Sequence, residues 1–186
     1  MSARIVAGVF KGRRLATPSG RDTRPTSDRV REALFGALGD LTGLRFADLY
    51  AGSGAIGLEA ASRGAAHVLL VEGDPRAGRV IRDNIAALRA GDVAKLAPSR
   101  VESVLPGGPG SGGPYDIVVA DPPYDTAETE ITELLRGLVE HGWLAPDALV
   151  AVERGTRSPA PTWVNGITGE RSRRYGETTL WYGRAS

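Results

Sequence analysis

The sequence contains no cysteine among its 186 residues. That absence excludes disulfide bonds, a thiol nucleophile and a zinc site with cysteine ligands. The two histidines, His67 and His141, lack any partner at metal-ligand spacing, so we expect no metal centre. No apolar run approaches the roughly 18 residues of a membrane-spanning helix, and the first residues lack a signal-peptide core. We therefore expect a soluble, cytoplasmic protein.

Charge is nearly balanced overall but is distributed unevenly along the chain. The net charge is +1, which by itself implies no binding partner. Residues 1–31, however, carry eight Lys and Arg residues against two acidic ones. Such asymmetry is typical of a basic extension attached to a nearly neutral body. A chain of this length is sufficient for one buried α/β core and short for two full domains.

The body of the chain after Leu44 alternates short apolar runs with segments of helical periodicity, which predicts a mostly parallel sheet covered by helices. The strands are expected near 45–50, 67–72, 95–100, 116–121 and 148–153, and the helices near 55–63, 75–88 and 127–141. Residues 164–175 and 178–183, divided at Gly176, favour an antiparallel hairpin at the sheet edge. The Gly- and Pro-rich segment 106–114 predicts a flexible surface loop without regular structure.

The N-terminal segment is expected to form a small β-hairpin followed by a helix. Residues 4–7 and 12–16 flank a turn near Gly8 to Lys11. Thr26, Ser27 and Asp28 offer side-chain oxygens that suit a helix N-cap before an apolar periodic stretch.

A glycine-rich segment follows the first strand of the body. Gly52, Gly54 and Gly57 fit the spacing G-x-G-x-x-G between a strand and a helix start. Missing side chains let a ligand lie against the backbone, and a helix N-terminus offers unpaired N–H groups. Glu72 lies twenty residues beyond Gly52, where a carboxylate can accept hydrogen bonds from ribose hydroxyls. These features favour a ligand that contains adenosine, either NAD or S-adenosylmethionine.

The tetrapeptide Asp121-Pro122-Pro123-Tyr124, at the end of a later strand, favours S-adenosylmethionine. The exocyclic nitrogen of a nucleobase is a poor nucleophile because its lone pair is delocalised into the ring. The Asp121 carboxylate and the Pro122 carbonyl can accept its two N–H hydrogens and aim the lone pair at a methyl donor. Tyr124 can stack on the base. The tetrapeptide therefore predicts methylation of a base amine, with no strongly perturbed general base required.

Two basic clusters, one near each end of the chain, are expected to contact nucleic acid. Lysine and arginine neutralise phosphates, although a solvated charged face would have the same composition. A base inside a helix is inaccessible, so the target must be flipped out or lie in a loop. The basic residues predicted to bind RNA are Arg4, Lys11, Arg13, Arg14, Arg24, Arg173 and Arg174, and Pro123 of the tetrapeptide is also predicted to contact the substrate.

Together these segments resemble the RsmD family of 16S ribosomal RNA (guanine-N2)-methyltransferases. The resemblance rests on 4–15, 24–35, 48–54 and 121–124, and it extends to the segment Arg174-Tyr175-Gly176-Glu177-Thr178. It implies a Rossmann-like methyltransferase fold with a C-terminal antiparallel hairpin, S-adenosylmethionine as methyl donor, and 16S rRNA within an assembling 30S subunit as substrate. It also implies that Arg24 and Thr26 lie near the mouth of the active site, where Thr26 is expected to contact the RNA as well.

The predicted catalytic residues are Asp121, Pro122 and Tyr124. The predicted cofactor-binding residues are Asp48, Tyr50, Gly52, Ser53, Gly54, Glu72, Gly73, Arg100, Val101 and Asp121. Relatives commonly carry an Asp after the third strand, where this chain has Arg100, so we expect the adenine to meet the backbone at Arg100 and Val101 or the side chain of Glu102.

We expect residues 1–40 to form an RNA-contacting extension and residues 41–186 the catalytic domain of a monomer. Two other functions share these motifs. A DNA adenine-N6 methyltransferase also carries Asp-Pro-Pro-Tyr but normally needs a larger target-recognition region. A non-catalytic RNA-binding assembly factor could retain the fold, although the intact Asp121 and Tyr124 argue against it.

Overall fold

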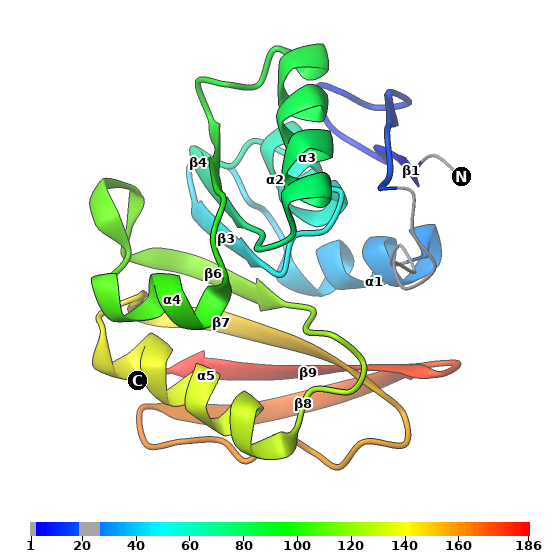
Figure 1. Cartoon of the computed structure of the whole chain (residues 1–186). Helices are drawn as coiled ribbons and strands as arrows, with labels where there is room; N and C mark the ends of the chain where they lie inside the picture. The colour runs from blue at the N-terminus through cyan, green and yellow to red at the C-terminus, as the bar shows by residue number, and fades with distance from the viewer. Residues whose placement is uncertain (1–2, 19–26) are drawn as a thin grey trace.

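The computed structural model describes residues 3–18 and 27–186 and contains a seven-stranded sheet flanked by helices (Figure 1). The order of the strands is β5-β4-β3-β6-β7-β9-β8. Neighbouring strands from β5 to β7 are parallel, whereas β9 runs antiparallel to both β7 and β8. The strands are β3 (Arg45–Leu49), β4 (His67–Val71), β5 (Ala94–Ala97), β6 (Tyr115–Ala120), β7 (Leu144–Gly155), β8 (Ile167–Tyr175) and β9 (Thr178–Ala185). The mostly parallel sheet and its C-terminal hairpin confirm the predicted fold class.

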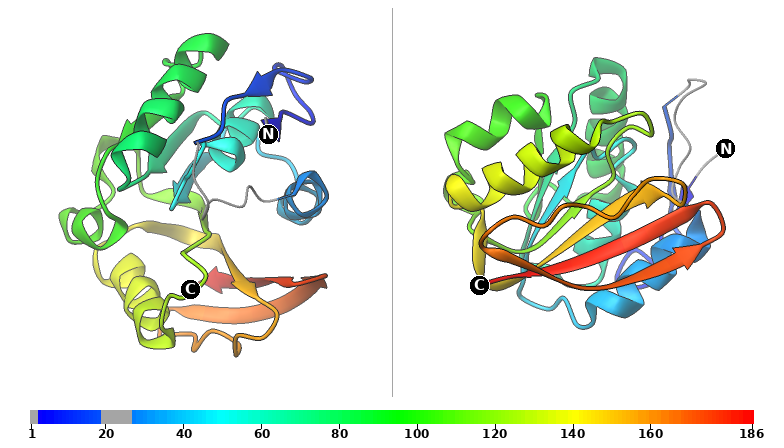
Figure 2. Two further views of the ribbon diagram at one scale, coloured as in Figure 1. Left: turned by 45° about the vertical axis from the view of Figure 1, so that its right-hand side comes forward. Right: turned by 90° about the horizontal axis from the view of Figure 1, so that it is seen from below.

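Helices cover both faces of this sheet, and each face has its own apolar core. The helices are α1 (Asp28–Leu38), α2 (Ala55–Ser62), α3 (Pro75–Leu88), α4 (Val101–Val104) and α5 (Glu128–Glu140). Side chains of α1, α2 and α3 pack on one face around Phe46, and those of α4 and α5 pack on the other around Trp143. Figure 2 shows the N-terminal hairpin and α3 at one side of the molecule, with α5 and the β8–β9 hairpin at the opposite side.

The starts of two helices follow directly from local sequence. The Ser27 hydroxyl accepts a hydrogen bond from the Val30 N–H at 3.2 Å, so α1 begins where the capping residues predicted. Asp74 caps α3 in the same manner, and Pro75 occupies its first turn, where its missing N–H costs nothing. Thr26, the other predicted capping residue, lies outside the described residues.

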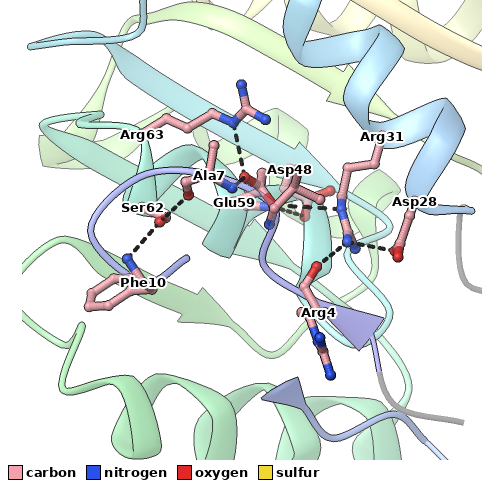
Figure 3. Close-up of polar contacts among 11 residues, drawn as sticks. Arg4, Ala7, Phe10, Asp28, Arg31, Asp48, Glu59, Ser62 and Arg63 are labelled. Atoms are coloured by element: carbon pink, nitrogen blue, oxygen red, sulfur yellow. Dashed lines mark hydrogen bonds and ion pairs between the residues drawn. The ribbon is translucent and has the colours of Figure 1, made fainter. Parts of the chain in front are cut away.

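The N-terminal extension is held to the body by a buried ionic network (Figure 3). Its short strands β1 (Ala3–Arg4) and β2 (Arg14–Leu15) pair antiparallel, as expected for a hairpin. Glu59 of α2 accepts hydrogen bonds from the N–H groups of Val6 at 2.8 Å and Ala7 at 3.0 Å. Arg31 of α1 donates to the Arg4 carbonyl and lies 3.7 Å from Glu59 Oε1, with both side chains fully buried.

The extension therefore shares one core with the body. Ile5 and Leu15 belong to the same apolar cluster as Phe46 and Leu58 of the sheet and α2. The division at residues 40 and 41 stays a prediction, and the contacts described here cross it.

The Gly- and Pro-rich segment differs from expectation, because it packs against the body instead of extending from it. It contains two short 3-10 turns, Leu105–Gly107 and Gly110–Gly112. The Arg45 guanidinium donates to the Gly112 carbonyl, and Trp143 Nε1 donates to the Leu105 carbonyl at 3.0 Å. A Cβ atom on Gly112 would collide with the His67 ring, so glycine at this position permits the close contact. These partners lie 38 and more residues away in the sequence, which is why composition alone did not predict them.

Within residues 3–18 and 27–186, no helix is both long enough and apolar enough to cross a membrane.

Candidate active site

The order of the strands reverses between β3 and β6, and both sequence motifs follow those two strands. In open α/β sheets, ligands bind beyond the carboxyl ends of the strands at such a reversal. The segment 50–54 follows β3, and the segment 121–124 follows β6, whose register pairs Leu49 with Ala120. The fold therefore brings the two motifs to one edge of the sheet.

The turn after β3 has the open backbone that ligand binding requires. Tyr50, Gly52 and Gly54 all have positive φ values, of 62°, 60° and 84°. A Cβ atom on Gly52 would have no heavy atom within 4 Å, whereas one on Gly54 would lie 3.1 Å from Leu70 Cδ2. Gly52 thus faces open space and Gly54 packs inward against β4. The distinction explains why both positions carry glycine: one leaves room for a ligand and the other for the core.

Glu72 connects this turn to the end of β4. Its Oε1 accepts a hydrogen bond from the Gly52 N–H at 2.7 Å, and its Oε2 accepts one from the Asp74 N–H at 2.8 Å. A carboxylate has about four acceptor positions, so two remain for the hydroxyls of a ribose. The half-buried Glu72 thus fits the predicted role in cofactor binding and also orients the glycine turn.

Asp48 lies beneath the turn rather than on its open side. The residue is 1% exposed, and its Oδ2 accepts a hydrogen bond from the Gly57 N–H at 2.9 Å. Burial raises the pKa of Asp48 to about 8, and the negative charges of Asp121 and Glu72 contribute to the same shift. A cationic ligand would offset this accumulation of negative charge. Direct contact between Asp48 and the cofactor stays a prediction.

The raised pKa of Asp48 makes stability depend on pH. Its folded pKa of about 8 lies above the ordinary value of an aspartate, so the folded state binds more protons between those two pH values and loses stability as the pH rises across that range to about 8. Asp48→Asn stays neutral while keeping an oxygen for the Gly57 N–H. We expect the melting temperature of the wild type to fall more than that of the variant between about pH 6 and about pH 9. An equal fall in the melting temperatures of the wild type and the variant over this pH range would contradict the raised pKa of Asp48.

The turn after β6 is arranged so that its aromatic residue faces solvent. Pro122 is buried, whereas Pro123 and Tyr124 are exposed, with 73% of Tyr124 accessible. The Thr126 N–H donates to the Pro123 carbonyl at 3.0 Å and closes the turn. A large aromatic ring left open to solvent beside a glycine-rich turn is a suitable platform for a flat ligand.

Sequence reasoning missed two residues of β7 that support this turn. Arg154 donates through Nη2 to the Thr126 carbonyl at 2.8 Å and to Glu128 Oε1 at 2.7 Å. A Cβ atom on Gly155 would lie only 2.8 Å from the Tyr124 hydroxyl, so Gly155 leaves the space that the ring occupies. No local motif marks either residue, because the contacts arise only when β7 aligns beside β6.

A cavity of about 480 Å³ extends from the turn after β3 between α4 and α5. Three predicted cofactor residues line it, Tyr50, Arg100 and Val101, together with Glu102. The Arg100 guanidinium pairs with Glu102 Oε1 at 2.7 Å. Gly73, at the end of β4, allows this segment to approach closely, since a Cβ atom there would lie 3.2 Å from Arg100 Cα. The residues predicted to bind adenine therefore line one cavity, and their contacts with the adenine stay predictions.

The structure separates the predicted RNA-binding residues into two groups. Arg173 and Arg174 lie near the tip of the β8–β9 hairpin, and the register places that tip beside the end of β7, because Thr178 pairs with both Gly155 and Tyr175. These two arginines therefore lie at the same sheet edge as Tyr124.

The basic residues of the N-terminal loop lie elsewhere. The Val9 N–H bonds to the carbonyl of Ser62, the last residue of α2, about 12 Å along the helix from the glycine turn. Arg13 donates to the Ala87 carbonyl near the end of α3. Lys11 and Arg13 are thus remote from the glycine turn, whereas Arg4 and Arg14 are exposed on the paired strands. Arg24 and Thr26 lie outside the described residues.

The strand order, the glycine turn and the Asp-Pro-Pro-Tyr turn at one sheet edge define a Rossmann-like methyltransferase. A family model described as conserved hypothetical protein 95 matches residues 3–184. The chain is 40% identical over 160 residues to ribosomal RNA small subunit methyltransferase D of Escherichia coli, covering 86% of this chain and 78% of that protein. The chain therefore belongs to this family, the RsmD family, as the sequence resemblance predicted.

Two further comparisons agree with that membership. A putative rRNA methyltransferase of Bacillus subtilis, YlbH, is 32% identical over 176 residues, which cover 94% of this chain and 95% of that protein. The solved structure described as putative methyltransferase yhhF from Escherichia coli superimposes with a TM-score of 0.86 at 36% identity, covering 100% of this chain and 99% of that one. The similarity thus extends over the whole fold, including the N-terminal extension.

Proposed function

We propose that this protein transfers a methyl group from S-adenosylmethionine to the exocyclic N2 of a guanine in 16S ribosomal RNA. The observation that carries the proposal is the position of Asp121-Pro122-Pro123-Tyr124 at the end of β6, beside the glycine turn that follows β3. The 40% identity to a protein named ribosomal RNA small subunit methyltransferase D supports the substrate class. The particular guanine atom rests on the resemblance to the RsmD family.

The residues at the sheet edge fit this cofactor. Open space above Gly52 accommodates the methionine moiety, Glu72 retains free acceptor positions for ribose hydroxyls, and Asp48 carries a pKa that a cationic neighbour would lower. The cavity beside Tyr50 and Val101 is the place for the adenine. When bound, S-adenosylmethionine supplies a methyl group activated by its sulfonium.

The chain itself positions and orients the acceptor base. The Asp121 carboxylate accepts one hydrogen of the amine, and the Pro122 carbonyl accepts the other, which directs the nitrogen lone pair out of the ring plane. Tyr124 stacks on the base, an interaction worth ~1–3 kcal/mol per base. Holding the two reacting atoms in line provides much of the rate enhancement. The amine proton becomes acidic as the methyl group is transferred, so it can leave to the Asp121 carboxylate or to solvent.

The direct test is methyl transfer from labelled S-adenosylmethionine into 30S subunits from cells that lack the enzyme, with naked 16S RNA and DNA in parallel. Digestion and mass spectrometry identify the labelled nucleoside. We expect N2-methylguanosine in RNA. Label in DNA adenine would overturn the substrate, and absence of label despite cofactor binding would favour a non-catalytic assembly factor.

The same experiment addresses the physiological form of the substrate. A chain of 186 residues offers limited surface for RNA recognition, so we propose that ribosomal proteins of a 30S particle assist a monomeric enzyme in the cytoplasm. Greater methylation of 30S particles than of naked RNA is the expected result. Sedimentation of the purified protein measures its oligomeric state.

The contact between Gly155 and Tyr124 gives a prediction about base stacking. Gly155→Ala inserts a methyl group where the tyrosine ring lies, and so displaces the platform. We expect the KM for RNA to rise about tenfold, as stacking contributes ~1–3 kcal/mol, while cofactor affinity is unchanged. Because Tyr124→Ala removes the same interaction, the double variant should be little worse than either single one. Additive losses would show that Gly155 acts independently of Tyr124.

A further inference from the structure

Asn84, in the third turn of α3, makes hydrogen bonds to two distant segments of the backbone. Its Oδ1 accepts from the Ala16 N–H at 2.9 Å. Its Nδ2 donates to the Ala16 carbonyl at 2.9 Å and to the Ser53 carbonyl at 3.0 Å. The side chain is 4% exposed, and both of its N–H donors are used. One buried amide thus joins the segment after β2 to the glycine turn.

Packing alone does not account for an asparagine at this position. Asn84 lies on the buried face of α3 with Ile81 and Leu88, three residues before it and four residues after it, where an amphipathic helix normally carries an apolar residue. Asparagine is also a weaker helix former than leucine. Both preferences disfavour asparagine here. The side-chain amide of Asn84 nevertheless forms hydrogen bonds with three backbone groups outside the helix.

The bond to Ser53 bears on the predicted cofactor site. Ser53 lies between Gly52, which faces open space, and Gly54, which packs inward. Glu72, which follows β4, accepts a hydrogen bond from the Gly52 N–H, and Asn84 of α3 donates one to the Ser53 carbonyl. Each glycine of the turn has a positive φ and little intrinsic preference for one conformation. Two side chains from different elements therefore hold the turn in shape, together with the backbone hydrogen bonds of Ala51.

The bonds to Ala16 bear on the N-terminal extension. Ala16 follows β2 and Arg14, and the chain continues from Pro18 toward the segment that contains Arg24 and Thr26, both predicted to contact RNA. Ala16 is itself exposed, so its tie to Asn84 is one anchor of a surface segment. The same amide therefore contacts the predicted RNA-binding extension on one side and the predicted cofactor-binding turn on the other.

We propose that Asn84 is a positioning residue that couples the N-terminal extension to the cofactor-binding turn. The proposal rests on the proposed function. Ordering the turn around the cofactor strengthens the shared hydrogen bonds and stiffens the segment at Ala16. Cofactor binding thereby raises the affinity of the extension for RNA. By thermodynamic reciprocity, RNA bound to the extension raises the affinity for the cofactor by the same factor.

Calorimetric titration with S-adenosylhomocysteine tests the first half of this coupling. Asn84→Ala is expected to weaken binding about tenfold, equivalent to ~1.4 kcal/mol, and to raise the KM for S-adenosylmethionine with kcat little changed. Asn84→Asp keeps the acceptor for the Ala16 N–H but loses both donors, so it should show a similar loss. Asp83→Ala, an exposed neighbour on α3, is the matched control and should bind like the wild type.

Hydrogen exchange on the wild-type protein tests the second half without any substitution. S-adenosylhomocysteine is expected to slow exchange of the Ala16 amide, and Asn84→Ala should abolish that effect. An unchanged affinity in both Asn84 variants, or an Ala16 amide indifferent to the ligand, would overturn the proposal. If Asn84→Ala does not fold, the affinity of Asn84→Asp for S-adenosylhomocysteine and the hydrogen exchange of the wild type test the proposal. Failure of the wild type itself to bind S-adenosylhomocysteine would instead contradict the proposed function.

Discussion

Asp121→Ala is expected to lower kcat for methyl transfer about 10²–10³-fold, the usual cost of removing one preorganised polar group from a reacting centre. The carboxylate follows β6 directly and is the only acidic side chain of the Asp-Pro-Pro-Tyr turn. Without it, one amine hydrogen loses its acceptor and the lone pair is no longer directed at the methyl donor. RNA affinity should remain close to that of the wild type, because phosphate contacts carry most of the binding free energy. Single-turnover methylation and filter binding measure the two quantities.

Two variants make this result specific. Asp125→Ala removes an exposed carboxylate four residues further on and should leave kcat unchanged. Asp121→Asn preserves the shape and one acceptor oxygen, so it should retain more activity than Asp121→Ala. Equal losses of turnover and of RNA affinity in Asp121→Ala would indicate that the residue binds substrate instead of orienting the amine.

Glu59→Ala is expected to destabilise the protein by about 3 kcal/mol, the lower end of the cost of breaking a buried ion pair, because Arg31 keeps its ion pair with Asp28. Arg31 is fully buried and lies 3.7 Å from Glu59 Oε1. The substitution also removes the acceptors of the Val6 and Ala7 N–H groups. The extension would lose these two attachments to α2 and keep its hydrogen bonds to Ser62, the last residue of that helix. Urea unfolding followed by circular dichroism measures the free energy of unfolding.

Glu32→Ala is the matched control, because Glu32 is an exposed acidic residue next to Arg31 on α1. Surface substitutions of this kind usually change stability by about 0.5 kcal/mol or less. Glu59→Gln keeps the size of the side chain and one acceptor oxygen, so its cost should be intermediate. A Glu59→Ala protein as stable as the control would mean that the network does not hold the extension.

The basic N-terminal segment illustrates the limit of arguments from charge. Eight of the first 31 residues are Lys or Arg, which suggests one RNA-binding arm. In the structure, Arg31 is buried in an ion pair, and Arg13 is bonded to the Ala87 carbonyl. Two residues of identical charge thus serve to attach the extension. Composition gives the number of charged residues. Whether a charged side chain binds RNA or holds the fold together depends on where the fold places it and on which groups lie beside it.

Local sequence nevertheless determined much of this protein. Short apolar runs indicated the parallel strands, helical periodicity over 75–88 indicated α3, and the two motifs at the ends of β3 and β6 identified the candidate site. Each of these signals resides within a few consecutive residues, so it is present before the chain folds. The family resemblance rests on the same short segments.

Only the tertiary structure decided which residues support those motifs. Asn84 reaches Ser53 across 31 residues, Glu59 reaches Ala7 across 52, and Arg154 reaches Thr126 across 28. The space that Gly155 leaves for Tyr124 arises from the alignment of β7 beside β6. An isolated Asn, Glu, Arg or Gly has no pattern that distinguishes it from others of its type. Its role follows from the backbone group that the fold places within hydrogen-bonding or van der Waals distance.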